Sequence, residues 1–261
     1  MRRFPRLPRL AYVTFVLALP LGFQPTRTDS TALSVGVFGG TGEAVAILRD
    51  CSGHSLAQST VHFRETAFAF GFTQADYDNV VTVGIRGGRF ESDDVLDPDH
   101  LEESRHFDRW YLNPHVAIEG ETFGVGFGLI APGVVAHVRE LGGPDESVAR
   151  KNSRTQIPLS GHLRVGQRND VYMQASLAEN TPIYSGGGLF NIGLGYQVMN
   201  GARGFTGFST GFYEQPAMLQ QASIDVPSTP IQVQLSTRFG GFGNDPESGG
   251  SVGLVYSPGA R

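Results

Sequence analysis

The stretch that decides the fold is Ile231-Gln232-Val233-Gln234-Leu235-Ser236-Thr237-Arg238-Phe239. Its odd-numbered positions carry Ile, Val, Leu, Thr and Phe, whereas its even-numbered positions carry Gln, Gln, Ser and Arg. Successive side chains of a strand point to opposite faces, so a period of two produces one apolar and one polar face. The stretch therefore predicts a β-strand that separates two different surroundings.

The same alternation recurs along the chain, and no long stretch keeps the 3.6-residue period of a helix. Residues 159–166 and 171–177 repeat it, and in 123–129 and 192–196 large apolar residues alternate with glycine. Repeated glycine on one face of a strand indicates tight curvature or a filled interior. We expect strands near residues 43–48, 59–72, 79–91, 109–119, 122–131, 155–167, 170–178, 187–198, 204–213 and 230–240.

The connections between these strands alternate between long and short. Asn169-Asp170 and Asn200-Gly201 are typical of tight hairpin turns. The long connections are expected near residues 92–108, 132–154 and 214–229. This rhythm predicts an all-β fold, an antiparallel up-and-down β-barrel of about 8–12 strands. The barrel is expected to be one domain over residues 26–261.

The N-terminus has the order of a secretory signal peptide. Arginines at positions 2, 3, 6 and 9 precede an uncharged, mostly apolar run from Leu10 to Phe23. This run is shorter than the ~20 apolar residues of a transmembrane helix. We expect residues 1–25 to form a signal peptide that is cleaved between positions 22 and 32. A buried helix or a short membrane anchor is the alternative.

The composition excludes several classes of protein. A net charge of −5 over 261 residues argues against a nucleic-acid binder. A single cysteine excludes a disulfide framework and a Cys-rich zinc site. The 35 glycines follow no Gly-X-Y period, so the chain is not collagen-like.

The alternation alone does not say which face meets which solvent. A soluble barrel turns its apolar side chains inward, whereas an outer-membrane barrel turns them to lipid. The export signal and the alternating connection lengths favour the membrane. The strands reach the ~9–11 residues needed to cross a bilayer at a tilt, which also favours the membrane. The polar faces lack lysine, which favours it further.

In this pattern residues 43–257 resemble the bacterial outer-membrane β-barrel class. Ser251-Val252-Gly253-Leu254-Val255-Tyr256 is similar to the closing strand of such barrels, which often ends in an aromatic residue, although residues 257–261 follow here. The resemblance implies outer-membrane lipid and the barrel-insertion machinery as partners. It implies the outer membrane of a Gram-negative-type bacterium as the location, with a periplasmic or secreted location as the alternative.

The polar faces of a membrane barrel line its lumen, where arginines pair with acids or amides. The lumen-facing candidates are Arg64, Arg86, His162, Arg164, Gln174, Gln232, Gln234 and Arg238. Aromatic rings gather where such a barrel meets the lipid headgroups. The candidates for these girdles are Trp110, Tyr111, Tyr196, Tyr213 and Tyr256.

No motif points to catalysis, a metal or a cofactor. Gly-x-Ser-x-Gly is absent. The calcium-loop spacing is also absent, so the acidic stretch 91–108 is expected to be a solvated outer loop with one short helical turn. Residues 39–43 (Gly-Gly-Thr-Gly-Glu) lack the spacing of a phosphate or dinucleotide site and are expected to form a turn.

We therefore expect a non-enzymatic outer-membrane barrel with a structural, adhesive or narrow-pore role. Two alternatives stay open. One is an exported soluble barrel that binds a lipid or a small apolar ligand in its interior. The other is a barrel hydrolase that acts on envelope lipids.

Overall fold

The computed structural model describes residues 30–49, 55–76, 79–96, 104–140, 151–199, 201–210, 216–240 and 247–258. The expected signal peptide, residues 1–25, and Tyr213 lie outside these ranges. Within them, no helix is long and apolar enough to cross a membrane.

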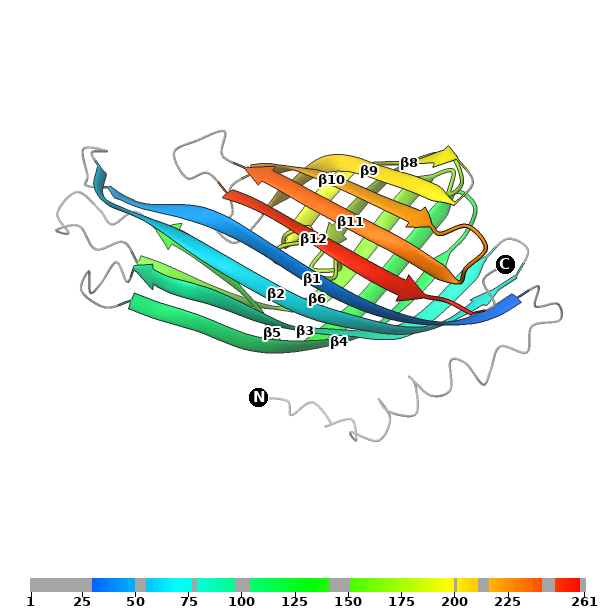
Figure 1. The fold of residues 1–261 in the computed structure, drawn as a ribbon, viewed down its shortest axis with the longest axis horizontal. Coiled ribbons are helices and arrows are strands. Elements are labelled where there is room, and N and C mark those ends of the chain that lie inside the picture. The colour runs from blue at the N-terminus through cyan, green and yellow to red at the C-terminus, as the bar shows by residue number, and fades with distance from the viewer. Residues whose placement is uncertain are drawn as a thin grey trace, which may run out of the picture.

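The described residues form strands that close into a single antiparallel barrel, which confirms the predicted fold (Figure 1). Each strand pairs with its neighbours in sequence, and β1 closes the barrel against β12 with Val35 opposite Tyr256. The strands are β1 Ser30–Arg49, β2 Ser55–Ala75, β3 Val80–Leu96, β4 Ser104–Glu119, β5 Phe123–Glu140, β6 Lys151–Gly166, β7 Val171–Leu177, β8 Phe190–Met199, β9 Ala202–Thr210, β10 Pro216–Asp225, β11 Ile231–Gly240 and β12 Glu247–Tyr256.

The start of β1 and the end of β12 lie at the same end of the barrel, here called the turn end (Figure 1). The chain also reverses there between β2 and β3, β4 and β5, β6 and β7, β8 and β9, and β10 and β11. Two of these reversals are the turns predicted from sequence. Asp170 donates its N–H to the carbonyl of Gln167 at 3.1 Å, and Gly201 has a φ of 78°. The opposite end is called the loop end.

Several expected boundaries are wrong because the strands are longer or more numerous than the alternation indicated. The expected long connection at 214–229 contains β10. Strands also enter the other two expected loops, since β3 continues to Leu96 and β6 begins at Lys151. The expected turn at 39–43 lies inside β1.

The two halves of the sheet differ in length. Strands β1 to β6 have 16–21 residues, whereas β7 to β12 have 7–10. About 9–11 residues cross a bilayer at the usual tilt. β7 pairs with β6 only over Gly161–Gly166, so the rest of β6 continues past it toward the loop end. The loop-end parts of β1 to β6 therefore stand beyond the short half, as the long ribbons of Figure 1 show, and are here called the wall.

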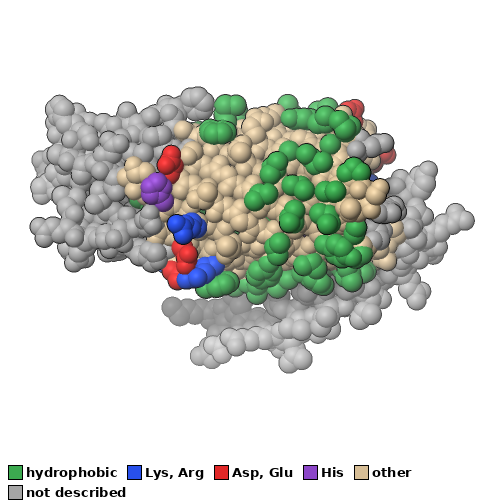
Figure 2. All heavy atoms as spheres, in the orientation of Figure 1, with side chains coloured by type: hydrophobic (Ala, Val, Ile, Leu, Met, Phe, Trp, Pro, Cys, Tyr) green, Lys and Arg blue, Asp and Glu red, His purple; other side chains and the backbone are tan. Residues whose placement is uncertain are grey.

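The outer surface at the turn end is apolar. Leu235 on β11 is 44% exposed, whereas Arg238 on the opposite face of the same strand is fully buried. Figure 2 shows the hydrophobic side chains gathered over this part of the barrel, here called the belt. It includes Val37, Phe70, Phe127, Leu163, Leu194, Leu235 and Leu254. A surface of this size and polarity is stable against lipid rather than water.

The outer surface of the wall is polar and charged, and Figure 2 shows its charged side chains beyond the belt. Outside β2, Phe68, Phe70 and Phe72 are followed toward the loop end by Thr66, Arg64 and His62. The expectation that Arg64 faces the lumen is therefore wrong. The strand has left the lipid at Arg64, so its outward position meets water and tolerates a charge.

Candidate functional site

A segment of chain closes the lumen from inside. Residues 178–189 connect β7 to β8 and fold inward rather than standing out at the loop end. Ile183, Tyr184, Ser185 and Leu189 of this inner segment are at most 4% exposed. Ile183, Tyr184 and Leu189 pack against apolar side chains on the inner face of the wall, which include Val61, Phe63, Phe90, Tyr111, Ile130 and Val134.

The carboxylate of Glu65, on the inner face of β2, anchors the inner segment. It accepts hydrogen bonds from the backbone N–H groups of Ile183 (2.8 Å), Tyr184 (2.8 Å) and Ser185 (2.9 Å). The Ser185 hydroxyl donates to it at 3.2 Å and the Tyr111 hydroxyl at 2.8 Å. A buried carboxylate is stable only when its oxygens are satisfied in this way. Glu65 is 1% exposed, so these donors replace its water.

Glycine lets the segment approach the barrel wall. A Cβ atom at Gly40 on β1 would lie 1.9 Å from the Ser185 hydroxyl oxygen, so a larger residue there would displace the segment. Gly188 has a φ of 78°, which favours glycine, and a Cβ there would lie 2.0 Å from the Thr210 carbonyl oxygen. Gly40 and Gly42 therefore make room for Ser185 and the Phe63 ring inside a strand, and residues 39–42 do not form the expected turn.

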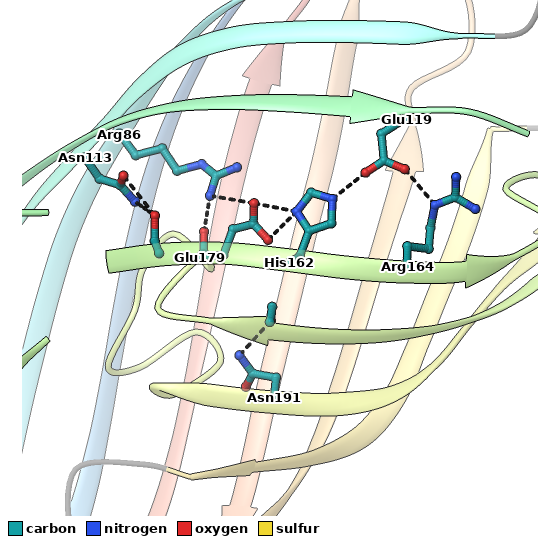
Figure 3. Close-up of polar contacts among 9 residues, drawn as sticks. Arg86, Asn113, Glu119, His162, Arg164, Glu179 and Asn191 are labelled. Atoms are coloured by element: carbon teal, nitrogen blue, oxygen red, sulfur yellow. Dashed lines mark hydrogen bonds and ion pairs between the residues drawn. The ribbon is translucent and has the colours of Figure 1, made fainter. Parts of the chain in front are cut away.

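A chain of charged side chains joins the inner segment to the turn end (Figure 3). Glu179, at the start of the segment, contacts Arg86 at 3.7 Å and the Nδ1 of His162 at 2.6 Å. The Nε2 of His162 contacts Glu119, whose other oxygen accepts from Arg164 Nε at 2.6 Å. Cations and anions thus alternate along the chain, from β3 through β6 to the end of β4.

The surroundings of His162 favour its doubly protonated form. Both ring nitrogens lie against carboxylate oxygens, and an imidazolium can donate to both of them. His162 is then a cation held between two anions. Neither nitrogen keeps a free lone pair, so His162 in this arrangement cannot serve as a general base.

The structure places the other lumen candidates on the inner face. Arg86, His162 and Arg164 belong to the charged chain, and Gln174 lines a cavity of about 380 Å³ beneath the inner segment. Gln232 and Gln234 line an adjoining cavity of about 320 Å³. Arg238 is fully buried next to the inner segment, where a Cβ atom at Gly188 would lie 3.0 Å from its Nη1.

The girdle candidates do not all lie on the outer face of the barrel. Trp110 and Tyr256 are 62% and 49% exposed on the outer face, and Tyr196 lies on the outer face over Gly204 of the next strand. The expectation for Tyr111 is wrong, because it is 5% exposed and its hydroxyl donates to Glu65 inside the barrel. Tyr111 precedes the outward Leu112 by one position, so the period of two puts its ring in the lumen.

Sequence reasoning missed the acidic residues of the site, Glu65, Glu119 and Glu179, and the inner segment itself. A signal was present in the segment, where Pro182-Ile183-Tyr184 stands between a polar stretch and three glycines. An apolar pair in a connection between strands needs a buried contact. Within the described ranges, no group of three or more His, Cys, Asp or Glu side chains could hold a metal ion.

No family model matches the chain, and no curated protein matches it. Solved structures with a similar fold include the Pseudomonas putida toluene transporter TodX, 10% identical over 94% of this chain and 92% of that one, at a TM-score of 0.40. The β-domain of the Bordetella autotransporter BrkA is 10% identical over 87% and 99%, with a TM-score of 0.43. The translocator domain of the Neisseria meningitidis autotransporter NalP is 10% identical over 94% of both chains, with a TM-score of 0.42. Similarities at such low sequence identity and TM-score do not indicate what the chain does.

The chain's own surfaces decide its class. It combines a closed antiparallel sheet, an apolar outer belt and a polar lumen at belt level, which is the architecture of bacterial outer-membrane β-barrels. The soluble-carrier alternative requires the opposite distribution, with apolar side chains inside and polar ones in solvent. The outer membrane of a Gram-negative-type bacterium is where this surface is stable.

Proposed function

We propose that the protein is a narrow outer-membrane channel that rests closed, with the inner segment 178–189 as its gate. The observation that carries the proposal is the position of that segment across the lumen, between an apolar seal and a polar cavity. Asn180 and Thr181 of the segment line both cavities at the turn end, so a solute that enters from that side meets the segment next.

The two attachments of the segment differ in a way that suits a gate. The attachment at Glu65 consists of five hydrogen bonds to a carboxylate that is buried beside the apolar core of the wall. The attachment at Glu179 is ionic and borders the cavity of about 380 Å³, which Arg86, Glu119 and His162 also line. Glu179 and His162 are each 10% exposed and border the cavity, so water there can hydrate both charges as they separate, whereas Glu65 is 1% exposed and does not border it. Release of the ionic attachment therefore begins the opening, and the Glu65 attachment restores the closed state.

The hydrolase alternative has less support in this geometry. His162 donates from both ring nitrogens to carboxylates. His115, the next histidine on the inner face, has its Nδ1 at 3.3 Å from the Asn113 carbonyl. Neither histidine is described with a serine hydroxyl as its partner, which the Ser-His arrangement of such enzymes requires.

Conductance in a planar bilayer tests the proposal. Ala178 donates its N–H to the Leu189 carbonyl at 2.5 Å, so an Asn-Gly turn can replace residues 179–188 without moving β7 or β8. The shortened barrel should conduct continuously, whereas the full chain should stay closed for most of the recording. A shortened barrel that folds and stays as closed as the full chain would overturn the gate.

The anchor gives a finer test. In the variant Glu65→Gln the carboxylate that accepts five hydrogen bonds becomes a neutral amide with one acceptor oxygen. Loss of about 1–3 kcal/mol of anchoring shifts the ratio of closed to open states by about 5- to 150-fold. Glu43→Gln is the matched control, because Glu43 is an exposed residue of the outer face of β1 and should leave gating unchanged.

A further inference from the structure

Two adjoining cavities lie in the lumen beneath the inner segment. They have volumes of about 320 and 380 Å³ and share Phe38, Asn180, Thr181 and Gln234 in their linings. Each falls within the ~300–1,000 Å³ of small-molecule sites. The lumen there is therefore wide enough to hold a molecule and not only to conduct water and ions.

Most charges of this region are already paired with one another. Arg86, His162 and Arg164 contact Glu119 or Glu179 in the charged chain. Arg203 is the cation that lines the smaller cavity without belonging to that chain. The cavities consequently present little net charge to a ligand.

Amides and hydroxyls supply the remaining hydrogen-bonding capacity. Gln234 donates to the Gln232 side-chain oxygen at 2.7 Å, and Gln232 donates to Asp225 at 2.8 Å. This ladder orients the Gln232 and Gln234 amides and leaves each a second N–H. The Thr181 hydroxyl oxygen is buried at the boundary of the two cavities and has no hydrogen-bond partner within the described residues. This oxygen has almost no accessible surface, so a ligand in the cavities contacts the Gln232 and Gln234 amides and not the Thr181 hydroxyl.

Three aromatic rings lie against glycine positions of the lumen wall and line the smaller cavity. A Cβ atom at Gly253 would lie 2.1 Å from the ring of Phe38, and one at Gly195 would lie 2.0 Å from the ring of Tyr172. The ring of Phe205 covers Gly193 in the same way, at 2.9 Å. A ring laid on a bare backbone keeps its other face toward the cavity. Aromatic faces attract the weakly positive C–H groups of a saturated ring.

We propose that these cavities bind a neutral, polyhydroxylated ring compound of one or two units, such as a mono- or disaccharide. Such a compound uses both kinds of surface, since its hydroxyls exchange hydrogen bonds with amides and its ring C–H groups cover an aromatic face. A charged ligand finds few unpaired counter-charges here, and an apolar ligand would leave the amides without partners. The inference rests on the proposed function, because the bound compound would be the solute that passes the gate.

Binding to the full chain in detergent tests the inference separately from transport. Isothermal titration uses maltose and glucose as neutral probes, and glucuronate and hexanol as the anionic and apolar ones. Saturable heats are expected with maltose, weaker ones with glucose, and none with the other two. Gln234→Leu removes a cavity amide and should weaken maltose binding by about tenfold. Gln220→Leu, the same change on the outer face of β10, is the control and should leave binding unchanged.

Two results would overturn the site: no heat from either sugar with folded protein, or tighter binding of glucuronate or hexanol than of maltose. The channel can fail without the site. If the full chain binds sugar but the shortened barrel does not conduct, the gate is rejected and the binding site stands. If the shortened barrel conducts but the full chain does not bind sugar, the binding site is rejected and the gate stands.

Discussion

The two halves of the barrel consist of the same kind of strand but differ in strand length and in what their outer faces contact. Strands β7 to β12 have about the length that lipid requires, and their outer faces are apolar along most of that length. Strands β1 to β6 continue past the lipid, and on β2 the polarity reverses: His62 and Arg64 face outward while Val61 and Phe63 are buried inside.

This difference shows that the polarity of a strand face depends on depth as well as on direction. In the belt the outer face meets lipid and the lumen holds polar groups. In the wall the outer face meets water, and the inner face becomes an ordinary dry core around the inner segment. The loop-end parts of the longer strands thus provide the apolar seal, and the turn-end parts of both halves line the cavities.

The largest expected effect separates the dry core from the wet lumen. Phe90 is 2% exposed and stacks on Tyr184 with ring centroids 4.1 Å apart, so Phe90→Ala should lower the free energy of unfolding by about 3–5 kcal/mol. Phe205, in the short half, is 8% exposed but borders a cavity and so is packed on fewer sides, and Phe205→Ala should cost less, about 1–2 kcal/mol. Urea unfolding of both variants in vesicles measures the difference. Equal losses would mean that the two interiors do not differ.

A smaller effect should separate two positions on the outer face of β2. Arginine in the belt costs about 2–4 kcal/mol near the bilayer midplane and about 0–1 kcal/mol near its edges. Phe70→Arg should therefore block stable insertion, whereas Thr66→Arg should be tolerated. The fraction of protein that keeps its heat-modifiable gel mobility after membrane insertion is the measurement. If arginine is tolerated at both positions, the outer face of β2 does not belong to the apolar belt.

Alternation showed two unlike faces on 231–239, because lipid and lumen impose opposite preferences on neighbouring positions, and the turn signals, connection lengths and export signal were needed to predict the closed barrel and the outward apolar face. β10 escaped prediction because it breaks that rule: Leu219 is buried inward, and Gln220 faces outward, where it donates to Thr206 at 2.5 Å. The outward side chains of Gln220 and Thr206 satisfy each other by this hydrogen bond, so the outer face of β10 does not show the apolar alternation with a period of two.

The expectations for Arg64 and Tyr111 are wrong for different reasons. The expectation for Arg64 assumes that every position of its strand lies within the membrane, whereas the expectation for Tyr111 rests on residue type although the alternation with the outward Leu112 places its ring inside. The position where β2 leaves the lipid depends on strand length and on where neighbouring strands end, which pairing in space determines. The attachment of Glu65 to Ile183 joins residues 118 positions apart, so local sequence does not contain it.

The accessibility of the outer face of β2 tests the comparison most directly. Nitroxide labels would be attached to single cysteines in a Cys51→Ser background, at His62, Arg64, Thr66, Phe68, Phe70 and Phe72 in turn. Labels at Phe68, Phe70 and Phe72 should collide mainly with oxygen, which concentrates in lipid. Labels at His62, Arg64 and Thr66 should collide mainly with a water-soluble nickel chelate. A profile that favours oxygen at all six positions, or nickel at all six, would contradict a strand that leaves the membrane between Thr66 and Phe68.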